Sequence, residues 1–245
     1  MKSPLEQFDI FNIKLVSFGG VDFSLNNILI PFFLILLFIC VYICVYSYNL
    51  SIIPFYIQNI VESIYIFLIY LIKQQAGTYG FFWFPFIFCI FHFILFSNLF
   101  SLIPFGIALT SHLILIFWLS CTTCISIFII GLLRFHLKFL YIFIPQCPFI
   151  LLPVLIPIEI FSYLIRLFSL SIRLAANILA GHTLVHIIVT FILNLIKVDL
   201  ILSIIFLIPL FLILILEFGV ALLQAYVFTV LTCIYLGDTK SLGAH

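Results

Sequence analysis

The sequence predicts an all-α membrane protein with about five membrane-embedded helices and one amphipathic interfacial helix. Of its 245 residues, 67% are hydrophobic and 7% are charged, whereas a soluble domain carries roughly a quarter charged residues. The apolar runs are long and lack the alternation of barrel strands, and only helices and closed barrels satisfy backbone polar groups in lipid. This composition excludes a water-soluble globule and a disordered chain. The net charge of +1 provides no basic patch for binding nucleic acid.

The first half of the chain is predicted to hold four elements. Residues 1–26 form an N-terminal segment without a cleavable signal pattern. Residues 27–48 are apolar and long enough to cross about 30 Å of hydrocarbon, so they form the first transmembrane helix. Residues 54–73 carry amide and carboxyl groups on an otherwise apolar helix, which indicates an amphipathic helix at the interface. Residues 79–134 form a helix pair that is interrupted near Pro104.

The second half is predicted to form a long helical hairpin over residues 157–236. The prolines between residues 144 and 157 should prevent a helix until the last of them, Pro157. From there to about residue 193 no proline follows, which gives roughly 36 residues or about 54 Å of helix. A second helix follows, in which Pro209 can produce a kink. Both helices exceed the length of a crossing, so we expect them to tilt strongly within a single membrane domain, residues 1–245.

Ionisable residues recur at helical spacing on the first helix of this hairpin. Glu159, Arg166 and Arg173 are seven residues apart, and Asn177 follows four residues later. Seven steps of 100° drift by only about 20°, so these residues form one polar stripe. An ionisable group in the middle of the bilayer costs about 2.5–3.5 kcal/mol, which makes each of them a candidate functional residue.

The second helix of the hairpin carries a matching set. Glu217, Gln224 and Tyr235 share one face, and His182 lies about opposite Arg173 on the preceding helix. Two polar stripes on consecutive helices indicate facing partners or a shared hydrated path.

Arg173 differs chemically from the titratable residues around it. A guanidinium group does not deprotonate in proteins, whereas Glu159, His182 and Glu217 can exchange protons. A permanent cation flanked by titratable groups is the arrangement expected of two proton pathways that are kept apart.

Four segments, in order along nearly the whole chain, carry a family resemblance. The most specific is LSIRLAANILAGH at residues 170–182; the others are QAYVFTVLT at 224–232, SNLFSLIP at 97–104 and SPLEQF at 3–8. Together they resemble subunit a of the F-type ATP synthase in its mitochondrial form.

The resemblance implies a proton-translocating stator subunit of the Fo sector in the mitochondrial inner membrane. Its partners would be the proteolipid subunits of the rotating c-ring, the peripheral stalk and other Fo subunits, membrane lipid and protons. It implies no cofactor, no metal site and no enzymatic activity of the chain by itself.

The resemblance also assigns the site by position. The residues assigned to proton translocation are Arg173, Glu217, His182, Glu159, Asn177 and Gln224. Arg173 would face the ring carboxylates, His182 and Glu217 would belong to the half-channel open to the intermembrane space, and Glu159 would belong to the matrix-side half-channel. Candidate half-channel lining residues are Asn98, Ser169, Arg166 and Tyr235. Asn98 can equally cap a helix, and Tyr235 can belong to an interfacial aromatic belt.

Two other classes of function remain open from the residues alone. A secondary transporter or respiratory-chain proton antiporter subunit would favour internal repeats, and none is convincing between the halves. A haem- or quinone-binding electron carrier would need more histidines at fixed spacing than His92 and His112 provide. Cys121 and Cys124 lack a second pair and are interpreted as packing residues.

Overall fold

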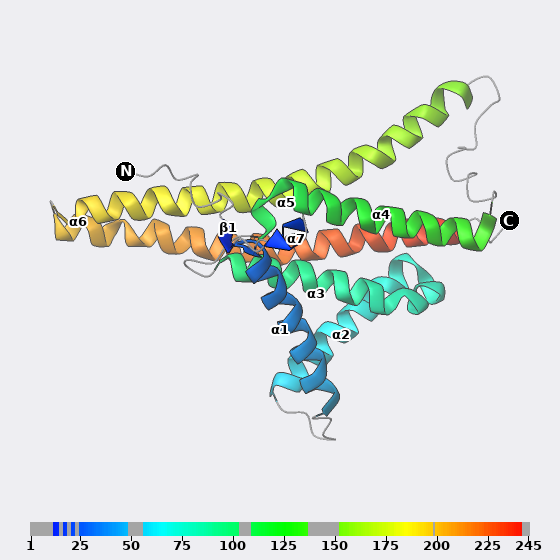
Figure 1. Ribbon diagram of the computed structural model, residues 1–245, viewed down its shortest axis with the longest axis horizontal. Helices are drawn as coiled ribbons and strands as arrows, with labels where there is room; N and C mark the ends of the chain where they lie inside the picture. Colours follow the sequence, from blue (N-terminus) through cyan, green and yellow to red (C-terminus); the bar gives the residue numbers. More distant parts are fainter. Residues whose placement is uncertain are drawn as a thin grey trace. The chain divides into compact units, whose positions relative to one another are not determined.

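The computed structural model describes residues 12–14, 17–18, 21–22, 25–48, 56–102, 109–136, 152–197 and 199–241. The helices of this part, drawn in Figure 1, are α1 (Leu29–Tyr48), α2 (Tyr56–Gln75), the 3-10 helix η2 (Gly77–Trp83), α3 (Phe84–Ser101), the 3-10 helix η3 (Leu109–Ser111), α4 (Leu113–Phe135), α5 (Leu152–Leu195), α6 (Leu200–Ile205) and α7 (Leu207–Ser241). The short strands before α1 are β1 (Asn12–Lys14), β2 (Ser17–Phe18), β3 (Val21–Asp22) and β4 (Leu25–Asn26). Strand β1 pairs antiparallel with β4, and β2 with β3.

Long apolar helices confirm the predicted class of all-α membrane protein. Within the described residues, four are long and apolar enough to cross a membrane: Gly80–Ser101, Leu113–Arg134, Leu152–Leu195 and Ile201–Asp238. A shorter apolar stretch covers Pro31–Ile43 in α1. Most of the N-terminal segment and the link after α4 lie outside the described residues.

Helix α5 begins earlier than predicted. No helix was expected before Pro157, yet α5 starts at Leu152 and includes Pro157. The expectation is wrong because Pro153 is the second residue of the helix, where a backbone N–H has no helical partner in any case. Pro157 then removes a single hydrogen bond, to the carbonyl group of Pro153. With 44 residues, α5 is about 66 Å long.

Pro209 interrupts the second long helix near its start. Helix α6 ends at Ile205, Phe206 follows, and α7 begins at Leu207. Pro209 has no N–H to donate to the carbonyl group of Ile205, four residues earlier, and its ring crowds that carbonyl group. The interruption therefore falls just before Pro209, which occupies a tolerated place in the first turn of α7. Helix α7 runs on to Ser241, beyond the predicted end.

The remaining helices lie close to their predicted bounds. Helices α1 and α2 are each within two residues of the predicted ranges 27–48 and 54–73. Helix α2 ends where Gly77 adopts a φ of 66°, the left-handed conformation that commonly terminates helices. The pair expected over residues 79–134 corresponds to α3 and α4, but η2 takes the place of the first turns of α3.

Contacts divide the chain into two compact units. Unit 1 comprises residues 1–40, 93–115 and 173–225, and unit 2 comprises residues 41–92, 116–172 and 226–245. Each unit is described separately below, and the single membrane domain over residues 1–245 stays a prediction.

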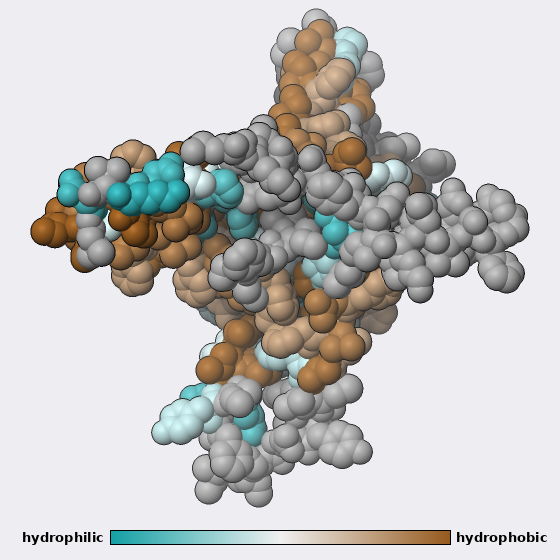
Figure 2. Space-filling view, turned by 60° about the vertical axis from the view of Figure 1, so that its left-hand side comes forward, coloured by the Kyte–Doolittle hydropathy of each residue, from teal (hydrophilic) through white to brown (hydrophobic). Residues whose placement is uncertain are grey.

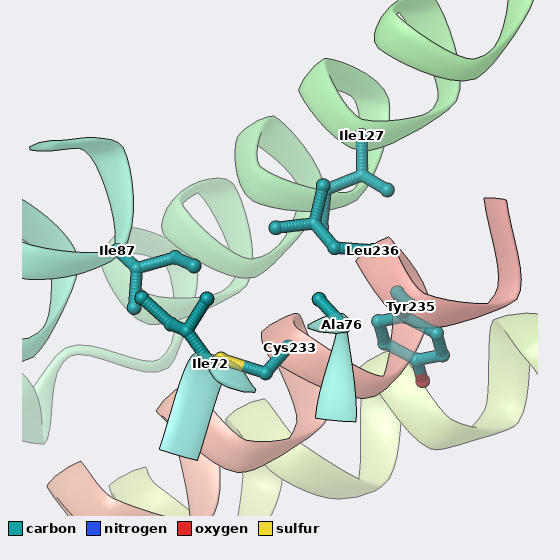
Figure 3. Close-up of a cluster of buried hydrophobic side chains, with 7 residues drawn as sticks. All are labelled: Ile72, Ala76, Ile87, Ile127, Cys233, Tyr235 and Leu236. Atoms are coloured by element: carbon teal, nitrogen blue, oxygen red, sulfur yellow. The ribbon is translucent and has the colours of Figure 1, made fainter. Parts of the chain in front are cut away.

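Each unit has its own apolar core. In unit 1, Ile35 and Ile39 of α1 pack on Leu109 of η3, with edge-to-face phenylalanine contacts between α1 and α3. In unit 2 the buried cluster shown in Figure 3 consists of Ile72, Ala76, Ile87, Ile127, Cys233, Tyr235 and Leu236. The Tyr235 hydroxyl group points away from the apolar side chains of this cluster (Figure 3).

The most apolar parts of the two long helices are barely covered by the rest of the chain. In the most apolar window of Leu152–Leu195, and likewise of Ile201–Asp238, only 6% of the residues are buried, against 44% for Gly80–Ser101. Hydrophobic colour accordingly covers most of the described surface in Figure 2. Exposed apolar area of this extent requires a lipid or protein environment.

Gly237 allows the end of α2 to pack directly on α7, and alanine should disturb that contact. A Cβ atom built on Gly237 lies 2.5 Å from the carbonyl oxygen of Gln75, a backbone atom that cannot rotate away. We expect Gly237→Ala to destabilise unit 2 by about 1–3 kcal/mol, measurable as a lower melting temperature of the purified complex. Gly219→Ala is the control, since nothing lies within 4 Å of its Cβ position. Equal melting temperatures for the two variants would contradict this close contact.

Candidate functional site

A cavity of about 300 Å³ lies in unit 1 between α3, α5 and α7. Most of its lining is apolar, and polar side chains reach it from all three helices. These residues are Asn98 and Ser101 on α3, Asn177 and His182 on α5, and Glu217 and Gln224 on α7. A mostly apolar cavity with a few convergent polar groups is the usual form of a binding or transport site.

Helices α5 and α7 run side by side in unit 1 (Figure 1), and Gly181 of α5 lies close to Glu217 of α7. A Cβ atom built on Gly181 lies 2.6 Å from the Glu217 Oε1 atom and 2.9 Å from its carboxyl carbon. Any larger residue at 181 would therefore occupy the space of this carboxyl group. The absence of a side chain at Gly181 places the Glu217 carboxyl group directly against the backbone of α5, next to His182.

Three acceptor oxygens in the cavity are buried without a hydrogen-bond donor among the described residues: Glu217 Oε1, Gln224 Oε1 and Asn98 Oδ1. Leaving such a group unsatisfied costs about 1–3 kcal/mol. The cavity exceeds the roughly 30 Å³ that one water molecule occupies in the liquid. These oxygens are therefore suited to accept hydrogen bonds from water or from a hydrated proton.

Two hydrogen bonds fix the polar groups of the cavity. The Asn98 amide Nδ2 donates to the carbonyl group of Ala221 on α7, at 3.3 Å. The ring of His182 donates to the carbonyl group of Ser101 on α3. Asn98 therefore bonds α3 to α7 and His182 bonds α5 to α3, which holds the three helices around the cavity.

The cavity brings together most of the residues that the resemblance assigned. Asn177, His182, Glu217 and Gln224 all line it, and so does Asn98. The helical spacing put Asn177 on the stripe of Arg173 and the resemblance put it near His182 and Glu217, and it lines the same cavity as these two residues.

Arg173 is not among the residues that line the cavity. Its side chain is exposed, whereas the neighbouring Leu174 and Ala175 are buried. Arg173 therefore presents its charge on the outer surface of this chain. Ser169 is also exposed on α5, within unit 2, and is not among the lining residues.

A second group of polar residues lies in unit 2, between α5 and α7. The Arg166 guanidinium group interacts electrostatically with the Tyr235 hydroxyl and the Asp238 carboxyl groups. The Glu159 carboxyl group also interacts electrostatically with the Asp238 carboxyl group. We refer to Glu159, Arg166, Tyr235 and Asp238 as the α5–α7 polar cluster.

Sequence reasoning missed Asp238. The sequence contained a pattern that could have identified it, because Asp238 follows Tyr235 by three residues and so lies on the same face of α7. Its position near the end of the helix made it resemble an ordinary interfacial charge. Its partner on α5, Arg166, becomes evident only from the packing of the two helices.

His92 was considered as a haem ligand and is instead part of an aromatic cluster. Its ring centroid lies 4.0 Å from that of Phe88 and 5.2 Å from that of Tyr42, and its Nδ1 atom bonds the carbonyl group of Phe88 at 2.9 Å. Within the described part of the chain, no group of three or more His, Cys, Asp or Glu residues is placed to hold a metal ion.

Comparison with known proteins identifies close relatives. A family model described as ATP synthase A chain matches residues 28–237. "ATP synthase subunit a" of Acanthamoeba castellanii is 41% identical, over 96% of this chain and 96% of that protein. The protein of the same name from Chondrus crispus is 42% identical, over 96% and 95%. That of Wolbachia sp. subsp. Drosophila simulans (strain wRi) is 39% identical, over 96% and 98%.

Proposed function

The chain belongs to the ATP synthase A chain family, and we propose that it forms two offset proton half-channels against a rotating c-ring, with Arg173 as the essential residue between them. As a member of this family it is a multi-pass membrane subunit of the proton-translocating Fo sector and not an enzyme on its own. Because the chain belongs to this family, a secondary transporter and an electron carrier are no longer the alternatives to consider. The residue roles below are our proposal.

The observation that carries this proposal is the convergence of Glu217, His182 and Gln224 on one cavity. A carboxyl group and an imidazole group are both able to take up and release protons near neutral pH. The buried acceptor oxygens of Glu217, Gln224 and Asn98 provide successive hydrogen-bonding positions for a proton that moves through water. We assign this cavity to the intake half-channel, which opens to the intermembrane space.

Arg173 separates the two half-channels in this proposal. Its exposed position on α5 suits contact with a neighbouring subunit, and its charge is permanent. An adjacent guanidinium group stabilises the charged form of a passing ring carboxylate, so the carboxylate gives up its proton on the exit side. The same charge repels a proton that would otherwise cross directly from intake to exit.

The α5–α7 polar cluster is assigned to the exit half-channel on the matrix side. Glu159 and Asp238 provide carboxyl groups that can accept the released proton, and Arg166 lies near both the Asp238 carboxyl and the Tyr235 hydroxyl groups. Charge compensation of this kind lowers the cost of keeping carboxylates within a membrane-embedded helix pair.

The partners proposed for the chain are the proteolipid c subunits, the peripheral stalk and other Fo subunits. The proposed location is the mitochondrial inner membrane, which the similarity to proteins of the eukaryotes Acanthamoeba castellanii and Chondrus crispus supports. The pairing of His182 with Glu217 also resembles the mitochondrial form. The bacterial Wolbachia protein matches at 39% identity, so the same architecture serves a bacterial membrane.

Removal of the Arg173 charge should abolish coupling. We expect Arg173→Ala to lower ATP synthesis driven by a proton gradient at least about 100-fold, because the ring carboxylate would no longer be discharged at the exit. The measurement is ATP synthesis and ATP-driven proton pumping in membranes with equal amounts of assembled complex. Arg134→Ala, which removes an exposed arginine at the end of α4, is the matched control. Unchanged ATP-driven pumping in Arg173→Ala would remove the central role proposed for Arg173.

A methyl group at Gly181 should displace the Glu217 carboxyl group without unfolding the protein. The atoms that the new Cβ would meet belong to the far end of the flexible Glu217 side chain, which can turn aside. We expect Gly181→Ala to assemble normally but to translocate protons about tenfold more slowly, because displacement of a reacting group by about 1 Å is costly. Proton flux through reconstituted complex is the measurement.

Gly219→Ala provides the comparison for Gly181→Ala, since its Cβ position is open and the residue also lies on the hairpin. Equal proton flux in the two alanine variants would show that the position of the Glu217 carboxyl group does not limit proton intake.

A further inference from the structure

Tyr163 lies within the α5–α7 polar cluster, and none of the roles above includes it. It follows Glu159 by four residues and precedes Arg166 by three, so the three side chains share one face of α5. The centroid of its ring is 4.8 Å from that of Tyr235 on α7, with an interplanar angle of 54°. The Tyr163 side chain also packs against the apolar cluster of Figure 3.

The hydroxyl end of Tyr163 is fixed by a third helix. It donates a hydrogen bond to the sulfur atom of Cys124 on α4. Tyr163 is therefore held at both ends, by the thiol group on α4 and by the Tyr235 ring on α7. The sequence suggested that Cys124 is a packing residue, but its sulfur atom also accepts this hydrogen bond from Tyr163.

Tyr235 interacts through its hydroxyl group with Arg166 on α5. Its side chain is only 4% exposed, and among the described residues its buried hydroxyl group has no hydrogen bond of normal geometry. The hydroxyl group nevertheless lies close enough to Arg166 to interact with its charge. The ring of Tyr163, which contacts the Tyr235 ring directly, acts together with this interaction to set the orientation of Tyr235.

We propose that Tyr163 is a positioning residue of the exit half-channel: anchored on Cys124, its ring holds the Tyr235 hydroxyl group beside the Arg166 guanidinium group. The inference rests on the proposed function, since it takes the α5–α7 polar cluster to be the exit path. A shift of Tyr235 changes the polar surroundings of Arg166, and Arg166 in turn acts on Asp238. Tyr163 thereby influences the pH at which the exit path accepts a proton.

Other groups could affect the same pH dependence. The titratable and charged groups that face the site come from three helices. They are Glu159 and Arg166 from α5, Asp238, Tyr235 and Cys233 from α7, and Cys124 and Cys121 from α4. Helices α2 and α3 contribute apolar contacts through Ile72 and Ile87, together with Ala76 at the end of α2.

The test is ATP synthesis by membranes with the complete complex, driven by an imposed proton gradient at a series of exit-side pH values. Tyr163→Leu removes the ring, and we expect about a fivefold lower rate and a shift of the pH midpoint by about half a unit. Tyr163→Phe keeps the ring but loses the bond to Cys124, so it should shift the midpoint less. Cys124→Ala should cause the same shift as Tyr163→Phe, and the double variant should add nothing, because both changes remove one interaction.

Tyr70→Leu is the matched control, because Tyr70 is 57% exposed on α2 in the same unit. It should leave the rate and the midpoint unchanged.

An unshifted midpoint in every assembled variant would overturn the proposal, even if rates fell in proportion to the amount of complex. If Tyr163→Leu does not assemble, Tyr163→Phe decides, since it fills the same space. If Arg173→Ala retained coupled activity, the proposed function would be refuted. If Arg173→Ala is inactive but the Tyr163 variants show an unshifted pH midpoint, only the role of Tyr163 is refuted.

Discussion

The high cost of an ionisable group in hydrocarbon determines where the charges of this chain can lie. Helices α5 and α7 are mostly apolar, and in their most apolar windows few residues are buried by the rest of the chain. Glu217 and His182 line a mostly apolar cavity of unit 1 with a few convergent polar groups, while Arg166 and Asp238 interact in unit 2. In unit 2 the opposite charges of Arg166 and Asp238 compensate one another, and in unit 1 the cavity leaves room for water beside the Glu217 carboxyl group.

Small residues make these compensating contacts possible. Without a side chain at Gly181, the Glu217 carboxyl group lies against the backbone of α5. At Gly237 the carbonyl group of Gln75 approaches α7 just as closely, one residue before Asp238. Helix association in membranes depends on such close packing, because lipid offers apolar side chains the same environment that a partner helix does. Packing and proton chemistry are therefore coupled at single positions, where one methyl group alters both.

The sequence predicts the class of fold and most of the polar residues that line the cavity of unit 1, but not the contacts between helices. Composition was sufficient for the membrane class, and the motif at residues 170–182 indicated Asn177 and His182. The rule that proline breaks a helix failed at Pro157, because it ignores how well the first turns tolerate proline. Asp238 and Tyr163 were missed because their roles come from Arg166 and Tyr235 across a helix pair, and periodicity defines only which residues share a face.

The exposure of Arg173 has a consequence for the whole subunit. An ionisable group that faces hydrocarbon is costly unless an opposite charge compensates it, and Arg173 is exposed while Leu174 and Ala175 beside it are buried. A neighbouring carboxylate that arrives and leaves would provide that compensation intermittently. In the proposed function, the transport site is therefore completed only where this chain meets a c subunit, and each ring carboxylate binds there, loses its proton and moves on.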